Sequence, residues 1–308
     1  MIAYLLRRLA VFIPVLLCIA VLSYLLVYFA PGSPFSSEKN ISGEALIALK
    51  KEYGLDRPLP AQILIYLKNV SRGYLGRSVY YRDRTVNEII AAALPVSVRL
   101  GLLALLIALV TGVPIGVVSA WRKNRAADYA AMSLSMIGIS VPSFVLAALL
   151  ILLFSFVLHW LPAVGYAGPR TLVLPVLTLA APYIAYLSRI TRAGLLEVLN
   201  QEYIVTARAK GLSVRRTLFV HGLKNGVVPV ISFLGPAAAG ILTGSIVVEK
   251  IFAIPGLGIN FIHSALHRDY FLAIGCALTY GLLLISFNLI SDLLYAIVDP
   301  RVSYAGKR

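Results

Sequence analysis

The chain has 308 residues, of which 59% are hydrophobic and only 13% charged, yet its formal net charge is +15. A soluble globular protein carries about 25% charged residues, so this composition is typical of an integral membrane protein whose basic residues lie in loops beside anionic lipid. It argues against nucleic-acid binding, which needs a solvated basic face, because most of this chain could not face water.

Long charge-free runs predict helices that cross a membrane, because a span needs about 20 apolar residues. Six runs reach or nearly reach this length: Leu9–Ala30, Gly101–Trp121, Tyr129–Leu158, Thr171–Ser188, Gly226–Val248 and Tyr270–Ser291. The first run follows two arginines, as in a signal peptide, but it is too long and no small-residue cleavage site follows it. We therefore predict an all-α integral membrane protein with six transmembrane helices, the first of them uncleaved.

Prolines inside the third and fourth runs predict kinks, because proline lacks the amide that continues a helix. Pro142 lies in the third run, and Pro175 and Pro182 lie in the fourth. Proline does not exclude a span, since neighbouring helices satisfy the freed carbonyl groups. The runs predict one membrane domain over 1–308, with a first helix at 9–30, a large loop at 31–98 and core helices at 99–301.

The distribution of Lys and Arg predicts the orientation, because short basic loops stay in the cytoplasm. One side of the predicted topology carries Arg7, Arg8, Arg122, Lys123, Arg125, Arg189, Arg192, Arg208, Lys210, Arg215, Arg216, Lys224, Arg301, Lys307 and Arg308. The short loops of the other side carry only Arg170, Lys250 and Arg268, and the 31–98 loop combines nine basic with six acidic residues. We predict cytoplasmic termini and an extracytoplasmic 31–98 loop.

Cysteine and histidine give weak evidence for chemistry. Cys18 and Cys276 fall inside predicted spans, where a free thiol behaves as a small hydrophobe and implies no disulfide framework. His263 and His267 have the i, i+4 spacing of metal ligands, but no zincin glutamate, nearby cysteine or third histidine accompanies them. We expect no metal and no cofactor in this chain, and we expect the pair to lie at an extracytoplasmic helix end.

Catalytic signatures are also scarce. The sequence contains no G-x-x-x-x-G-K-[ST] loop, so it lacks the P-loop that binds a nucleotide, and we expect no enzymatic activity. Asp292 lies near the end of the last run, where an ionisable residue suggests function. The alternative that we favour is that Asp292 reaches water or a basic side chain at the cytoplasmic boundary.

The segment EYIVTARAKGLSVRRTLFVHGLKN, residues 202–225, separates the fourth and fifth runs. Its first part is compatible with a helix that becomes basic toward its C-terminal end, and Gly211 is the residue type most often found just beyond a helix. Ser213 is a suitable N-cap for a second helix after the glycine, so two short helices joined at a glycine are predicted. By itself this pattern also fits an interfacial helix held against lipid by Arg208, Lys210, Arg215 and Arg216.

Several motifs resemble those of bacterial binding-protein-dependent ABC importer permeases. The generic motif, Glu-Ala-Ala, three residues, Gly, nine residues and Ile-x-Leu-Pro, is matched only at Ala207, Gly211 and Leu223. The variant of the peptide and nickel branch is matched closely, by TARAKG at 206–211, H-x-L-K-N at 221–225 and Pro229. Further stretches of the same branch are RRLAVFIPVLL near the start, APGSPF at 30–35, LPVSVRLGLLALLIALVTGVPIGVVSA at 94–120, PSF at 142–144, GSIVVEKIFAIPGLG at 244–258, HRDY at 267–270 and DLLYAIVDPR at 292–301.

The resemblance covers the whole chain and is greatest to the B-type permease subunit of oligopeptide importers. It implies a multi-pass protein of the bacterial inner membrane, in which two permease subunits enclose the path, two cytoplasmic ATPases dock beneath and an extracytoplasmic binding protein delivers substrate. Residues 202–225 would then be a cytoplasmic coupling segment. The ATPase-coupling residues would be Glu202, Tyr203, Thr206, Ala207, Arg208, Ala209, Lys210, Gly211, Leu212 and Arg215.

The sequence leaves other functions and substrates open. A stand-alone secondary transporter usually needs intramembrane ionisable groups and inverted repeats, and the spans offer little beyond Asp292; a membrane scaffold without a path is a third alternative. Oligopeptides, dipeptides, nickel chelates and sugars are not separated by the sequence. Ser140, Pro142 and Ser143 are candidates for the path lining, although serine in a span packs helices equally often.

Overall fold

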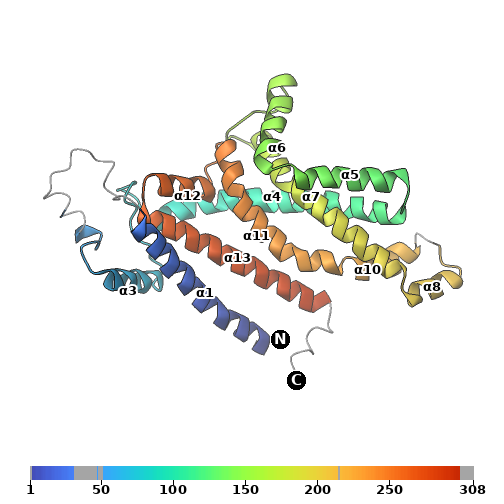
Figure 1. Ribbon diagram of the computed structural model, residues 1–308, viewed down its shortest axis with the longest axis horizontal. Coiled ribbons are helices and arrows are strands. Elements are labelled where there is room, and N and C mark those ends of the chain that lie inside the picture. Colours follow the sequence, from blue (N-terminus) through green and yellow to red (C-terminus); the bar gives the residue numbers. More distant parts are fainter. Residues whose placement is uncertain (1, 31–46, 48–50, 214–215, 299–308) are drawn as a thin grey trace. The chain divides into compact units, whose positions relative to one another are not determined.

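The computed structural model describes residues 2–30, 47, 51–213 and 216–298, and these residues are mainly helical (Figure 1). The extended pairing within these ranges is a single bridge between Arg77 and Thr85. The chain divides into two compact units, the first formed by residues 1–98 and 254–285 and the second by residues 99–253 and 286–308. The division falls inside two long helices, α4 (Val86–Trp121) and α13 (Tyr270–Val298).

The first unit contains α1 (Ile2–Phe29), α3 (Leu59–Val70), α12 (Leu257–Leu266) and the first parts of α4 and α13. A buried cluster of Ala20, Tyr24, Tyr66, Ile274 and Leu278 joins α1, α3 and α13. The hydroxyl of Tyr24 also donates a hydrogen bond to Gln62 Oε1 at 2.9 Å. Helix α3 therefore packs on α1 and α13, two candidate membrane spans, although it belongs to the predicted 31–98 loop.

Helix α4 begins well before the charge-free run that predicted a span from Gly101. Thr85 and Glu88 form a capping box: the Thr85 hydroxyl accepts from the Glu88 amide at 3.2 Å, and the Glu88 carboxylate accepts from the Thr85 amide at 3.1 Å. These reciprocal bonds satisfy amides at the helix start that would otherwise have no partner. The expected end of the loop at residue 98 is thus inside a helix that starts at Val86.

The second unit is organised around α7 (Pro169–Leu199). The other elements are α5 (Ala126–Ser140), α6 (Ser143–Leu150), the π-helix η1 (Ile151–Val157), α8 (Glu202–Ala209), the π-helix η2 (Thr217–Gly222), α10 (Leu223–Gly226) and α11 (Val228–Ile251). Helix α7 contacts α5, α6, α10 and α11. Pro175 and Pro182 lie inside α7 and do not end it, so the helix is longer than the predicted Thr171–Ser188 span.

Helices α4 and α7 lie with their backbones in direct contact at two glycines of α4. A Cβ atom added to Gly112 would lie 2.8 Å from the carbonyl oxygen of Ile184, and one added to Gly116 would overlap the carbonyl oxygen of Ser188. Glycine allows this approach because it has no side chain to separate the two backbones.

Five helices of the described residues are long and apolar enough to cross a membrane, and there are six if one bent pair counts as a single span. The bent pair is Ala126–Ser140 with Ser143–Val157, which turns by 106°. Val141, directly before Pro142, is extended with ψ of 121°, as expected because proline disfavours the helical conformation in the residue that precedes it. The kink predicted at Pro142 is therefore a complete break in the helix.

Candidate functional site

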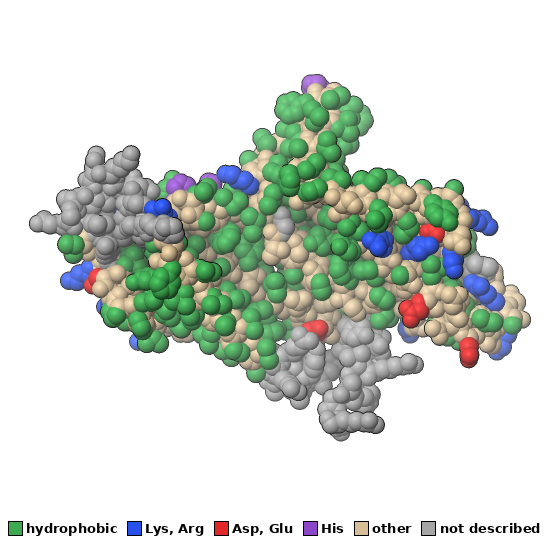
Figure 2. All heavy atoms as spheres, in the orientation of Figure 1, with side chains coloured by type: hydrophobic (Ala, Val, Ile, Leu, Met, Phe, Trp, Pro, Cys, Tyr) green, Lys and Arg blue, Asp and Glu red, His purple; other side chains and the backbone are tan. Residues whose placement is uncertain are grey.

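Helix α8 lies on the surface of the second unit, beyond the C-terminal end of α7 (Figure 1). Ile204 is completely buried and fixes the helix to the unit, whereas Tyr203 and Val205 are 43% and 59% exposed. Figure 2 shows Lys and Arg side chains gathered at this end of the unit. The helix thus presents an exposed surface of mixed apolar and charged character, with Glu202 in its first turn and Arg208 in its last.

Gly211 ends α8 in the left-handed conformation that the sequence predicted, with φ of +83°. The Gly211 amide donates to the Arg208 carbonyl at 2.9 Å, and the Leu212 amide donates to the Ala207 carbonyl at 3.3 Å. These two bonds form a Schellman motif, which satisfies carbonyl groups at the end of the helix. A Cβ atom at Gly211 would meet no atom within 4 Å, so the position requires glycine for its backbone conformation and not for space.

The second half of the segment begins at Ser213, and its predicted capping role is confirmed. Ser213 Oγ accepts from the Arg216 amide at 3.3 Å, and its carbonyl accepts from the Thr217 amide at 2.9 Å. Beyond this cap, Leu218 of η2 is buried in a cluster with Val117, Ala120 and Leu195. The segment is therefore a helix, a glycine turn and a second helix that packs firmly on α4 and α7.

A hydrogen bond ties the two halves of the segment together. The side-chain amide of Asn225, on α10, donates to the hydroxyl of Tyr203, on α8, at 3.0 Å. Together with the buried side chains of Ile204 on α8 and Leu218 on η2, this contact attaches the segment to the second unit at three points.

The predicted coupling residues all lie in this segment, and the structure describes every one of them except Arg215. Ala207 and Leu212 are half-buried, and the others are exposed, namely Glu202, Tyr203, Thr206, Arg208, Ala209, Lys210 and Gly211. Arg215 lies outside the described residues. The three candidates for a path lining are elsewhere, at the break between α5 and α6, where Ser140 and Pro142 are exposed and Ser143 is half-buried.

The His263 and His267 pair lies at the end of α12. His267 Nδ1 donates to the carbonyl oxygen of His263 at 2.9 Å, and its ring lies 4.0 Å from the ring of Tyr80, centroid to centroid. Within the described ranges, no group of three or more His, Cys, Asp or Glu side chains could hold a metal ion. Asp292, the other ionisable candidate, is half-buried on α13.

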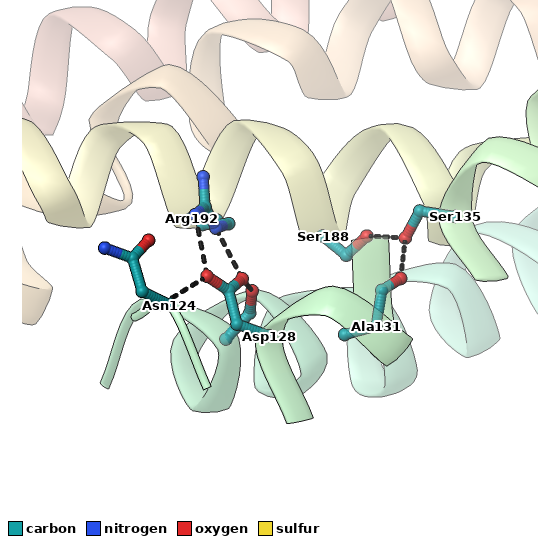
Figure 3. Close-up of polar contacts among 7 residues, drawn as sticks. Asn124, Asp128, Ala131, Ser135, Ser188 and Arg192 are labelled. Atoms are coloured by element: carbon teal, nitrogen blue, oxygen red, sulfur yellow. Dashed lines mark hydrogen bonds and ion pairs between the residues drawn. The ribbon is translucent and has the colours of Figure 1, made fainter. Parts of the chain in front are cut away.

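An ion pair with a buried carboxylate links α5 to α7, the helix that leads to α8, and sequence reasoning missed it. Asp128 of α5 is 2% exposed, and its carboxylate accepts two hydrogen bonds from Arg192 of α7, from Nε at 2.7 Å and from Nη2 at 2.8 Å (Figure 3). The Ser119 hydroxyl of α4 and the Asn124 amide also donate to this carboxylate, the latter at 3.0 Å. The carboxylate is thus fully hydrogen-bonded in a bidentate arrangement of the stronger kind.

A second polar contact joins α5 and α7 further along the same face (Figure 3). Ser135 Oγ and Ser188 Oγ are 2.7 Å apart, so one hydroxyl donates to the other, and the hydroxyl that accepts donates in turn to a carbonyl of its own helix, that of Ala131 or Ala185. Since Arg192 and Ser188 are both on α7, α5 is held to the helix that leads to α8 at two levels. The available signal for this site was Arg192 itself, an ionisable residue at the edge of a predicted span.

Comparison with known proteins places this arrangement in context. Residues 112–304 match the family described as "Binding-protein-dependent transport system inner membrane component", and residues 1–101 match its N-terminal companion, "Binding-prot-dependent transport system membrane comp, N-term". The oligopeptide transport system permease protein OppB of Haemophilus influenzae is 43% identical over 306 residues, covering 99% of this chain and 100% of the relative. The dipeptide transport system permease protein DppB of Bacillus subtilis is 41% identical over 304 residues, covering 99% of each.

Two solved structures share the fold of about two thirds of the chain. A chain of the MetNI methionine ABC transporter, in inward-facing conformations, has a TM-score of 0.57 with 14% identity and covers 68% of this chain and 96% of its own length. A chain of an amino acid ABC transporter with histidines has a TM-score of 0.56 with 19% identity, and the match covers 68% of this chain and 94% of that chain.

Proposed function

The chain belongs to the family of binding-protein-dependent transport system inner membrane components, and from this membership we propose that it is the membrane-spanning permease subunit of an ATP-driven peptide importer. The observation that carries the proposal is the near full-length identity of 43% to a protein named an oligopeptide permease. Among the relatives compared, the two named dipeptide permeases are 41% and 39% identical. We therefore rank oligopeptides first among the substrate classes. Dipeptides and nickel chelates are the alternatives within the same branch.

The proposed assembly needs further chains. The family description names a binding protein, and the sequence contains no P-loop, so ATP hydrolysis is assigned to two cytoplasmic ATPase subunits. A second permease subunit completes the path, and the binding protein delivers the peptide from outside. This chain then has no catalytic residue and no cofactor of its own.

Helix α8 is the proposed docking element for an ATPase subunit. Three properties support this role: its outer face is exposed, its inner face is anchored by Ile204, and its end is fixed by the Gly211 turn. The Asp128–Arg192 pair then holds α7, from which α8 continues, to α5. A movement of the docked ATPase would thus reach the spanning helices without being absorbed by local flexibility.

The proposed topology has six spans in the bacterial inner membrane, counting α5 with α6 and η1 as one. It is supported by the apolar helices of the described residues and by the excess of Lys and Arg in the connections assigned to the cytoplasm. In this topology 1–308 is one membrane domain, residues 31–98 are extracytoplasmic, and both termini and residues 202–225 are cytoplasmic.

Site-specific labelling tests this topology. A cysteine in place of Tyr53 is expected to react with an impermeant maleimide added outside spheroplasts, and a cysteine in place of Arg308 only after the membrane is broken. The native Cys18 and Cys276 are replaced by serine beforehand, so that each variant has one thiol. Labelling of both positions from the same side would exclude six spans with cytoplasmic ends.

The His263 and His267 pair is expected to be dispensable for transport of a metal chelate. In proteoliposomes, the double alanine variant should take up peptide and nickel chelate in the same ratio as the unchanged protein. Because His267 stacks on Tyr80, loss of the ring costs about 1 kcal/mol of stability, and His267→Phe is the control that keeps the stacking. Selective loss of nickel chelate uptake in the double variant would show that the substrate ranking is wrong.

Uptake measurements test the proposed function itself. Proteoliposomes that contain the chain, its partner subunits and the binding protein should accumulate a labelled tripeptide only when ATP is enclosed with the ATPases. Unlabelled oligopeptides should compete better than dipeptides, nickel chelates or sugars. Accumulation by this chain alone, driven by an ion gradient, would instead identify a secondary transporter.

A further inference from the structure

A cavity of about 210 Å³ lies in the second unit, between the C-terminal ends of α4 and α7, the outer end of α8 and η2. Its floor is apolar and includes Leu196, Leu199 and Leu218. Leu218 is buried in the cluster that attaches η2 to α4 and α7, and the other two leucines pack against that cluster. The apolar side of the cavity is therefore formed by residues that belong to, or pack against, the buried core of the unit.

The polar part of the cavity wall is positively charged. Lys123 comes from the turn after α4, Arg208 from the last turn of α8, and Asn200 from the turn between α7 and α8. All three side chains are exposed, and the lining contributed by the described residues contains no Asp or Glu. Two cations and an amide donor in one cavity lining, with no acidic residue among them, favour an anion that accepts several hydrogen bonds.

The position of Trp121 favours a cavity mouth close to the membrane surface. It is the last residue of α4, a candidate membrane span, and its indole is 48% exposed next to the cavity. Tryptophan is enriched where a span meets the membrane surface, because its ring is apolar and its N–H is a hydrogen-bond donor. An anion at this depth is most readily supplied by a lipid headgroup, since basic pockets between spanning helices on the cytoplasmic side bind such groups.

The size of the cavity limits the ligand. Sites that enclose a drug-sized molecule measure about 300–1,000 Å³, which is larger than this one. A cavity of this size accommodates a phosphate with the atoms next to it and leaves any hydrocarbon outside. We propose that it binds the phosphate of an anionic phospholipid between Lys123 and Arg208, with the acyl chains along Trp121.

Because Arg208 also belongs to α8, a bound headgroup fixes the outer end of that helix against α4 and α7. Arg208, one of the predicted coupling residues, then contacts lipid, whereas the exposed Tyr203 and Val205 are outside the cavity lining and stay available to the ATPase. Anionic lipid content would thus set how firmly the proposed docking helix is held.

Fluorescence of Trp121 tests the proposal in the full-length chain. The chain has two tryptophans, so Trp160→Phe leaves Trp121 as the single reporter. This protein is placed in phosphatidylcholine nanodiscs that contain increasing amounts of brominated phosphatidylglycerol or, in parallel, brominated phosphatidylcholine. Half-maximal quenching of Trp121 is expected at a several-fold lower fraction of the brominated phosphatidylglycerol. Equal quenching by the two lipids would overturn the proposal.

Two neighbouring substitutions separate a site from general surface charge. Lys123→Gln should raise the phosphatidylglycerol fraction needed for half-maximal quenching about five-fold, the effect of one cation near an anionic surface. Arg122→Gln removes one positive charge from the neighbouring residue, which is outside the cavity lining. This variant should change the phosphatidylglycerol fraction for half-maximal quenching only a little. Similar effects of the two variants would mean that the lipid is only concentrated at the surface, and no effect of Lys123→Gln would exclude the site.

Other anions are distinguished in the same nanodiscs. Millimolar inorganic phosphate should not remove the preference for phosphatidylglycerol, and if it does, the cavity binds free phosphate and not lipid. An acidic side chain of the ATPase is the remaining candidate. If Lys123→Gln weakens ATPase binding while lipid quenching is unchanged, the cavity belongs to the docking interface and the lipid assignment is wrong.

Discussion

Replacement of Gly211 by valine is expected to leave the chain in the membrane and to abolish ATP-driven uptake. The residue has a φ of +83° and donates one of the two hydrogen bonds that end α8. A β-branched residue at positive φ costs about 1–3 kcal/mol of backbone strain, and no steric contact adds to this because the space around the position is open. The strain is therefore confined to the turn that sets the direction of the docking surface.

Three readouts in liposomes separate docking from insertion: the amount of inserted chain, copurification of the ATPase, and peptide-stimulated ATP hydrolysis. Gly211→Asn is the matched variant at the same position, because asparagine tolerates the left-handed conformation, and it should keep most of the uptake. Gly73→Val imposes similar strain elsewhere, since Gly73 also has positive φ and open space around it, and it should leave ATPase copurification unchanged.

Normal hydrolysis and uptake in Gly211→Val would remove the coupling role of α8. The interpretation of α8 as a helix that only rests on lipid gives a different result: membrane contact of the segment changes while ATPase copurification is intact.

Asp128→Ala is expected to be the most destabilising single substitution of the second unit that we propose. It leaves the half-buried Arg192 guanidinium, whose side chain is 26% exposed, without its partner, and removing one partner of such a hydrogen-bonded pair costs about 1–3 kcal/mol. The Ser119 hydroxyl and the Asn124 amide lose the same acceptor. Thermal unfolding of the purified full-length chain should shift to clearly lower temperature, and ATP-driven uptake should fall because α5 is no longer held to α7.

The chain offers a matched control for this result. Glu52→Ala removes a carboxylate that lies 3.7 Å from Arg77, but both side chains of that pair are more than half exposed, so its loss should cost less than about 1 kcal/mol. The double variant Asp128→Leu, Arg192→Met should be less destabilised than Asp128→Ala, because it leaves no unpaired charge. Equal unfolding temperatures for Asp128→Ala and Glu52→Ala would contradict the structural role of the pair.

Features that depend on neighbours along the chain were predictable from the sequence. The apolar runs located the long helices, Pro142 located the break between α5 and α6, and Gly211 and Ser213 gave the end of one short helix and the start of the next. Each of these signals acts over a few residues, through missing amides, left-handed backbone or a capping hydroxyl. Thr85 and Glu88 have the spacing of a capping box, which is a similar local signal for the start of α4.

Features that depend on contacts between distant residues were not predictable in the same way. Asp128 and Arg192 are 64 positions apart, and neither residue alone indicates its partner. Helix α3 was not predicted, because the contacts that hold it come from a distant part of the chain. Tyr66 packs against residues of α1, and Gln62 accepts a hydrogen bond from Tyr24 of α1. The roles of individual residues in α8 are likewise set by a partner chain, so they stay predictions that docking measurements must test.

The direct contact of α4 and α7 at Gly112 and Gly116 decides how a force applied to α8 spreads. No side chains separate the two backbones there, so no rotamer change can absorb a relative displacement, and sliding would press carbonyl oxygens into the facing helix. We therefore expect α4 and α7 to move together in this region when α8 is displaced. Bending that accompanies such a displacement is expected outside the contact at Gly112 and Gly116, where side chains separate the helices and can change rotamer.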